Sequence, residues 1–147
     1  ILVIRVGDVL KMAVPSIIFR SDAADFKTES EIKGGIREDQ KVNNERVLKR
    51  IAEILNKFKN YTVTIEGHAN NVSGTDTEEN EDTTQYGKAL KPLSRERAEF
   101  VKSYLRKNGV DGNRLTAVGR GGSQPVVARN DKDNWWKNRR VEFILNK

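Results

Sequence analysis

The chain has 147 residues, of which 36% are hydrophobic and 33% are charged, and it contains no cysteine. This length suits one domain with a core of its own, and the lack of cysteine excludes disulfides, thiolate catalysis and cysteine-ligated metals. The formal net charge of +6 favours polyanionic neighbours, although a charge of this size also serves solubility alone.

The first 13 residues are expected to form a leading strand or linker that enters the domain from an upstream region. Their apolar start is interrupted by Arg5 and Asp8, which excludes a signal peptide or a membrane anchor. No apolar run approaches the roughly 20 residues that a membrane-spanning helix needs. Because the chain does not begin with Met, we expect it to be a piece of a longer protein. The domain itself is expected to span residues 14–147.

The first half of this domain is predicted to hold two strands and a helix. The apolar run 14–19 suits a strand, and the polar stretch 21–40 is expected to be a long loop. A helix is predicted over 43–58, with Asn43 as its N-cap and apolar residues at helical spacing. The run 61–66 alternates apolar and polar residues, which is typical of a strand that is buried on one face.

The second half is predicted to hold an acidic loop, two helices and two strands. The acidic stretch 75–82 is expected to be exposed. Ser94 is a good N-cap for the next helix, and Asn108-Gly109 ends it, because glycine readily adopts the left-handed conformation. The remaining elements are a short strand over 114–118, a short helix over 131–136 and a final strand over 140–145.

The predicted elements run strand, helix, strand, helix, strand, short helix, strand. Strands that alternate with helices favour a layered α/β fold rather than a helical bundle or an all-β sandwich. We therefore predict an α+β sandwich with a mixed four-stranded sheet and the helices on one face. No internal repeat is visible in the sequence.

Three motifs follow one another along the chain in a fixed order. They are Ile65-Glu66-Gly67-His68, then Leu93-Ser94 with Arg97-Ala98 and Val101, then Asn138-Arg139-Arg140-Val141-Glu142. In this order they resemble the OmpA-like peptidoglycan-binding domain, which is also found in Pal and MotB-type proteins. The resemblance covers roughly residues 14–146 and implies a βαβαβαβ fold.

The resemblance also implies a ligand and the residues that hold it. In this family the usual ligand is the diaminopimelate of the peptidoglycan stem peptide, whose free end carries an ammonium and a carboxylate. Arg97 would hold the carboxylate with its planar fork, helped by the dipole of the helix if Ser94 is the cap. Asn70, with Asn71 beside it, would contact the amine. Arg139 would support the far side of the pocket.

Arg139 and Arg140 are adjacent, so they are expected to point to opposite sides of the final strand. We expect Arg139 to face the pocket and Arg140 to pair with an acid such as Glu142 on a neighbouring element. The plainer interpretation is that both arginines form structural ion pairs.

One position departs from the family pattern. Asn70 stands where the family has the aspartate that holds the ammonium, and Ala69 stands in place of its threonine. A charge-assisted hydrogen bond contributes about 1.5–3 kcal/mol against about 0.5–1.5 kcal/mol for a neutral one, so losing the charge weakens binding by roughly tenfold or more. Asp76 or Glu78 of the acidic stretch could fold over the pocket and supply the missing charge, although such a run is usually a solvated loop.

The tryptophan pair and the single histidine lie outside the ligand motif. Trp135 and Trp136 could present a flat surface to sugar rings, but such a pair more often packs into the core, which we expect for at least one of them. His68 is expected to pack beside the strand end and to bond to the backbone. It is the only histidine, and no second metal ligand or Ser-His-Asp arrangement accompanies it, so neither a metal nor an enzymatic site is predicted.

The leading functional hypothesis is a non-catalytic module of a bacterial envelope protein. It would tether a larger protein to the cell wall from the periplasmic side, through diaminopimelate or a related diamino acid, and would need no cofactor. The alternative is a domain of the same fold that has lost diaminopimelate binding and serves a structural or protein-interaction role. Nucleic-acid binding rests on net charge alone and has no motif behind it.

Overall fold

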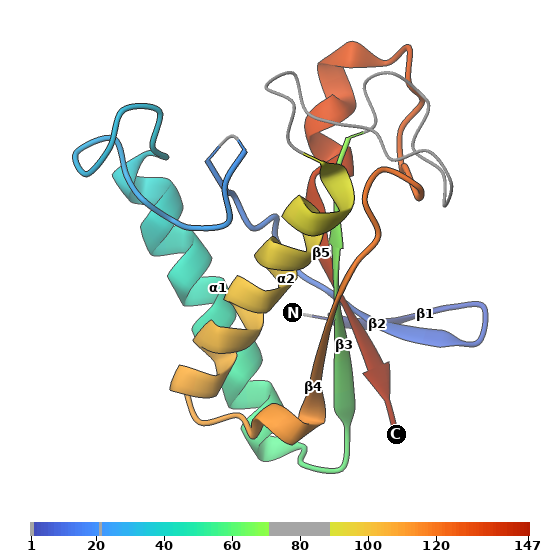
Figure 1. The fold of residues 1–147 in the computed structure, drawn as a ribbon. Coiled ribbons are helices and arrows are strands. Elements are labelled where there is room, and N and C mark those ends of the chain that lie inside the picture. The colour runs from blue at the N-terminus through green and yellow to red at the C-terminus, as the bar shows by residue number, and fades with distance from the viewer. Residues whose placement is uncertain (1, 21, 71–88) are drawn as a thin grey trace.

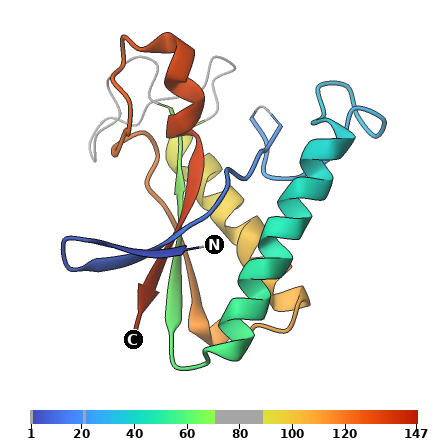
Figure 2. The same ribbon diagram turned by 180° about the vertical axis from the view of Figure 1, so that it is seen from behind.

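The computed structural model describes residues 2–20, 22–70 and 89–147. Its strands are β1 (Leu2–Val6), β2 (Val9–Ala13), β3 (Thr62–His68), β4 (Leu115–Gly119) and β5 (Arg140–Asn146). Its helices are α1 (Glu38–Lys57), α2 (Leu90–Lys107) and the short 3-10 helices η1 (Gly112–Arg114) and η2 (Lys132–Asn138). Both α-helices lie on the same side of one sheet (Figures 1 and 2). The predicted α/β fold with helices on one face is confirmed.

The sheet has five strands rather than the expected four, in the order β1-β2-β5-β3-β4. It is mixed, because β3 and β4 are parallel and the other neighbours are antiparallel. The register pairs Ile65 with Phe143 and Glu66 with Glu142. Since side chains alternate along a strand, the first pair faces the helices and the second faces the open side of the sheet.

The additional strands come from the leading segment. β1 and β2 form a hairpin that turns at Gly7, where φ is +63°, a left-handed value that glycine adopts without strain. β2 then pairs with β5, so the hairpin becomes one edge of the sheet. The segment expected to be a leading strand or linker is therefore part of the same sheet.

The run 14–19 was predicted as a strand, and this prediction is wrong. Pro15 has no backbone N–H to give to a ladder. Ile18 bonds instead to a side chain of α1: its N–H donates to Asn44 Oδ1 at 3.0 Å, and its carbonyl accepts from Asn44 Nδ2 at 2.7 Å. The buried side-chain amide of Asn44 thus makes the two hydrogen bonds that a neighbouring strand would otherwise make with Ile18.

Helix α1 begins at Glu38, five residues before the predicted N-cap Asn43. The residue at the cap position is Arg37, whose backbone N–H donates to Gln40 Oε1 at 3.0 Å. Glu38 and Asp39 place negative charge in the first turn, where the helix dipole favours it. Arginine is an uncommon cap, so the sequence pattern directed the prediction to the later asparagine.

Helix α2 begins at Leu90, so Ser94 is not its cap. Pro92 falls in the first turn, where the missing N–H of proline costs little. Ser94 is buried inside the helix, and its Oγ accepts from the N–H of Gly121 at 3.0 Å. Arg97 therefore lies about two turns inside the helix and gains nothing from the dipole at its start.

Helix α2 packs directly on β3 and β4 because two glycines face it. A Cβ atom on Gly67 would overlap the Ser94 carbonyl, and one on Gly119 would lie 2.6 Å from the Arg95 nitrogen. Gly67 was expected to end its strand, but β3 continues through His68. This close packing brings the carboxyl end of β3 beside the first turns of α2.

The remaining helices and strands predicted within the described residues are present, with small shifts at their ends. Gly109 follows α2 with a φ of +93°, as the predicted stop requires. The short predicted helix near residue 131 is the 3-10 helix η2. The predicted apolar stripes form the core: Val47, Leu48, Ile51 and Leu55 of α1, Ala98, Val101 and Leu105 of α2, and Val63, Ile65, Val141 and Phe143 of the sheet.

Candidate functional site

A cavity of about 230 Å³ lies where the segment before α1, helix α2 and the start of β5 meet. In Figure 1, η2 (orange-red) stands at this end of the sheet, near the carboxyl end of β3 and the start of α2. Three arginines and an apolar wall share the cavity. The lining residues are Ser16, Ile17, Ile18, Phe19, Arg97, Trp136, Arg139 and Arg140.

Arg97 is fixed in this cavity by contacts with three residues of the segment before α1. Its side chain is buried, Nε donates to the carbonyl of Ala23 at 3.0 Å, and Nη2 donates to the carbonyl of Arg20 at 3.3 Å. Its Cζ lies 5.2 Å from the centroid of the Phe19 ring, a favourable cation–π contact. A guanidinium has five N–H donors, so these two bonds leave donors for a ligand.

The charge of Arg97 is incompletely compensated. Burial, followed by the charge of Arg139, lowers the pKa of Arg97 to about 10, although Asp22 and Glu96 act in the opposite direction. The group is still protonated at neutral pH. Within the described residues its hydrogen bonds go to carbonyl oxygens and not to a carboxylate. A buried cation without a bonded anion is unfavourable by itself, and an entering carboxylate would relieve it.

The two arginines that follow η2 differ in their partners. Arg139 is exposed and lines the cavity, as expected. Arg140 Nη2 lies 3.1 Å from Glu142 Oε2 and 2.9 Å from the carbonyl of Gln124. The predicted pairing of Arg140 with Glu142 is confirmed, although both residues lie on β5 rather than on neighbouring elements. Arg140 also lines the cavity, so both arginines border it, and Arg139 lies just before the regular strand.

Asn70 is held by a buried partner from the other end of the chain. Asn138 Oδ1 accepts from the backbone N–H groups of Val126, at 2.8 Å, and Val127, at 3.1 Å. Its Nδ2 therefore faces Asn70 and donates to Asn70 Oδ1 at 2.8 Å. The acceptor atom of Asn70 is already engaged.

The structure thus brings together two of the predicted ligand residues, Arg97 and Arg139. Among the described residues that line their cavity, Asn70 is absent, and it is linked to the site through Asn138, the residue before Arg139. Asn71 and the acidic stretch 75–82, with Asp76 and Glu78, lie outside the described residues.

Both tryptophans of η2 lie outside the core, so the expectation that at least one would pack into it is wrong. Trp136 is 48% exposed and lines the Arg97 cavity. Trp135 is partly buried, and its Nε1 donates to the carbonyl of Arg129 at 2.8 Å. Sequence reasoning missed these positions because η2 stands at the end of the sheet instead of covering the hydrophobic core.

A second charged cluster occupies the open face of the sheet. His68 Nε2 lies 3.0 Å from Glu142 Oε2 and 3.3 Å from Glu66 Oε1. The expected backbone bond of His68 is thus replaced by contacts with carboxylates from the register-paired acids. Lys11 lies 3.0 Å from Glu142, and Arg120 lies 3.0 Å from Glu66.

Glu66, His68 and Glu142 of this open-face cluster are residue types that bind metals, and one possible ligand atom from each lies within 4.8 Å of the others. However, Lys11, Arg120 and Arg140 already compensate the two carboxylates. A divalent cation would have to enter beside these three positive charges. The hydrogen bond from His68, followed by that from Lys11, lowers the pKa of Glu142 to about 2. The cluster is therefore a structural ion network that joins β2, β3, β4 and β5.

The model of the OmpA family matches residues 41–139, which include Asn70, Arg97 and Arg139. The chain belongs to the OmpA family. This domain is 36% identical over 98 residues to the peptidoglycan-associated lipoprotein of Rhizobium meliloti, an alignment that covers 67% of this chain and 49% of that protein. It is 33% identical over 100 residues to the peptidoglycan-binding protein ArfA of Mycobacterium bovis, covering 68% of this chain and 27% of that protein.

Solved structures support the same fold for this OmpA-family domain. The periplasmic domain of Helicobacter pylori MotB superposes with a TM-score of 0.66 and 20% identity, covering 99% of this chain and 88% of that one. The chain spans about half the length of the Rhizobium lipoprotein and of its Agrobacterium fabrum counterpart, at 49% and 50%. Within the described residues, neither long helix is apolar enough to cross a membrane.

Proposed function

We propose that this OmpA-family domain is a non-catalytic module that binds a carboxylate of the peptidoglycan stem peptide in the Arg97 cavity. It would thereby tether a larger envelope protein to the cell wall in the periplasm. The observation that carries the proposal is the buried, incompletely compensated charge of Arg97 beside a second cation, Arg139. The names of the relatives in Rhizobium and Mycobacterium support peptidoglycan as the source of the ligand.

Different walls of the cavity would contact different parts of the ligand. The remaining N–H donors of Arg97 would bond the carboxylate, and Arg139 would add attraction from the exposed side. Ile17 and Phe19 would contact the aliphatic part of the ligand. About 230 Å³ corresponds to roughly eight water molecules, which suits the end of one amino acid.

Recognition of the amine of the diamino acid depends on Asn70. Diaminopimelate or a related residue would present its ammonium towards Asn70, whose Oδ1 is engaged by Asn138. Asn70 Oδ1 keeps one lone pair and carries no charge, while Nδ2 is a donor, which does not attract an ammonium. We therefore propose that the domain binds mainly through the carboxylate and selects the amine only weakly.

The same engagement of Asn70 supports the second candidate function. If the carboxylate contact alone is too weak, the domain keeps the fold and serves a structural or protein-interaction role. The two candidates differ in whether an isolated stem peptide binds at all.

Calorimetric titration with a stem tripeptide that ends in diaminopimelate tests the proposal. The wild-type domain should release or absorb heat on binding, and the same peptide with its carboxylates amidated should not bind, because Arg97 then lacks an anion to pair with. A folded domain that gives no heat with the free tripeptide at millimolar concentration would overturn the tethering function and leave the structural role.

A further inference from the structure

Trp136 has a position that the carboxylate site does not explain. The residue is 48% exposed, although tryptophan is highly buried on average, and it borders the cavity that contains Arg97. Exposed aromatic rings that border a polar site commonly serve as binding surfaces. The ring therefore extends the site beyond the cavity itself.

The ring is carried on a rigid support. Asn138, at the end of η2, is buried and bonds to Asn70 and to two backbone N–H groups of the preceding loop. At the other end of η2, Asn134 Nδ2 donates to Asp131 at 3.0 Å, and Trp135 is bonded to Arg129. A preorganised surface loses little conformational entropy when a ligand lies on it.

The surroundings of Trp136 are basic and polar. Lys137 Nζ lies 5.6 Å from the centroid of the Trp136 ring, and Arg139 lines the same cavity. Arg129 and Lys132 lie with Trp135 around a neighbouring depression. An apolar protein surface that covered Trp136 would desolvate these cations at a cost, whereas a sugar offers oxygen acceptors to them and an apolar C–H face to the ring.

We propose that Trp136 forms a sugar-stacking subsite at the mouth of the Arg97 cavity, which takes an amino-sugar ring of the glycan strand. This inference rests on the proposed function, because the stem peptide is linked to such a sugar and the cavity has room only for the peptide end. The indole face contacts the C–H face of the sugar, while Lys137 donates to its oxygens. Trp136 thus makes the domain prefer a peptide that is still attached to its glycan.

The test compares two probes by calorimetry: the sugar-free stem tripeptide, and the same tripeptide attached to its N-acetylglucosamine–N-acetylmuramic acid disaccharide. In the wild-type domain the disaccharide should raise the affinity by about five- to tenfold, the range expected for one aromatic stacking contact. Trp136→Ala should remove this gain, so that the two probes bind with equal affinity; the ratio of the two affinities is the readout, because Trp136 also lines the peptide cavity. Trp136→Phe, which keeps a ring, should retain part of the gain.

Trp135→Phe is the matched control, because it changes the neighbouring ring without touching the cavity, and it should behave as the wild type. Thermal melting of each variant shows that it is folded. Equal affinity of the wild type for the two probes would overturn the sugar subsite and leave the proposed function intact. A ratio of the two affinities that stays at the wild-type value in Trp136→Ala would also overturn it, since the sugar would then gain nothing from the Trp136 ring. If the wild type binds neither probe, both proposals fail.

Discussion

The two charged regions of this domain handle their charges in opposite ways. On the open face of the sheet, Glu66 and Glu142 each lie about 3 Å from a cation, and His68 joins them. In the cavity beside α2, Arg97 is bonded to carbonyl oxygens while Arg139 stands near it. Among the described residues, the cations and carboxylates of the first region are paired, whereas Arg97 in the second has no carboxylate bonded to it.

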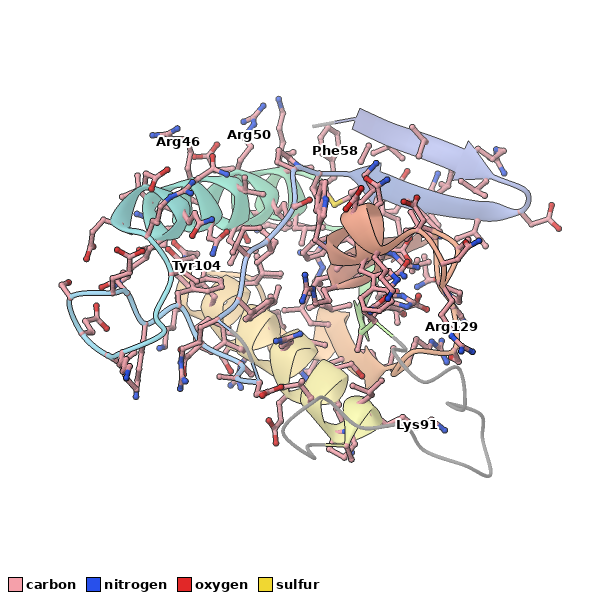
Figure 3. The ribbon with its side chains drawn as sticks, turned by 90° about the horizontal axis from the view of Figure 1, so that it is seen from above. Arg46, Arg50, Phe58, Lys91, Tyr104 and Arg129 are labelled. Atoms are coloured by element: carbon pink, nitrogen blue, oxygen red, sulfur yellow. The ribbon has the colours of Figure 1, made fainter. Side chains whose placement is uncertain are left out.

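This difference separates a structural role from a binding role. A paired network stabilises the strands that it joins, and removing one member leaves the others uncompensated. A buried cation that lacks a carboxylate contributes little to the fold and retains its attraction for a ligand. Arg50 of α1, which points away from the molecule (Figure 3), shows a third state: it is exposed to water and also lies 3.0 Å from Glu53.

The strongest test removes the buried cation Arg97, which is not bonded to a carboxylate of the described residues. Arg97→Met should lower the affinity for the stem-peptide carboxylate by about 10- to 100-fold, because a charge-assisted contact is lost. The unfolding free energy should change by only about 1 kcal/mol, since the lost bonds to carbonyls are offset by the removal of a buried charge. Calorimetry and urea denaturation measure the two effects.

Arg95→Met is the control for this change. Arg95 lies on the same helix, is exposed, and has Glu99 as a partner at 3.9 Å. It should leave the affinity unchanged. Equal losses in the two variants would mean that net charge, and not the cavity, attracts the ligand.

Acid should lower the stability of the domain through the ion network on the open face of the sheet. The pKa of Glu142 falls from 4.5 in the unfolded chain to about 2 in the folded domain. Its contribution to stability is therefore complete above about pH 4.5 and is lost as the pH falls towards 2. The loss should amount to about 2 kcal/mol, which is less than the pKa change alone would give because the group is partly solvated. Urea denaturation across this pH range measures it.

Glu142→Gln removes this titration. The variant should be less stable than the wild type at pH 7, and its stability should change less between pH 4.5 and about 2. Glu99→Gln, at an exposed position, is the control and should follow the wild-type curve. Parallel curves for the wild type and Glu142→Gln would contradict a depressed pKa at this residue.

Asn70→Asp should add a negative charge at the residue that is bonded to Asn138, next in the chain to Arg139. Asn138 would hold one carboxylate oxygen and leave the other for an ammonium. The affinity for a peptide with a free diaminopimelate amine should rise by about tenfold. The same peptide with its amine acetylated should show no gain, and a gain of the same size with that peptide would rule out ammonium recognition.

Salt should give the smallest effect. Raising the ionic strength from roughly 0.05 to 0.5 M should weaken ligand binding by about threefold, because Arg139 is exposed to screening while Arg97 is buried. The affinity should be followed by calorimetry at each salt concentration. A complete loss of binding at high salt would indicate nonspecific basic attraction instead of a shaped cavity.

The parts of the fold that were predictable are those with a repeating local pattern. The helix around Ile51 and the strand around Ile65 show clear apolar periodicity, and both are present in the core. The start of α2 was placed five residues too late because Ser94 has the chemistry of a cap, whereas the cap position is Ala89 and proline falls in the first turn. Local preference at a helix end is weak compared with the packing of the helix on the glycines of the sheet.

The site was predictable in its motif residues and not in their environment. Arg97 and Arg139 were found from the order of the motifs, but the burial of Arg97 depends on Ala23 and Phe19, which no local pattern connects to it. The bond between Asn70 and Asn138 joins residues that are 68 positions apart. Such contacts follow from the topology of the sheet and are invisible to periodicity.

The amide clamp of Asn44 on Ile18 has a consequence for the dynamics of the cavity wall. Ile18 belongs to a segment without regular secondary structure, yet its N–H is bonded to a buried side chain of α1. Its amide hydrogen should therefore exchange slowly with deuterium, at a rate that follows the opening of α1 rather than the motion of a loop. The cavity wall at Ile18 should therefore open only when α1 opens.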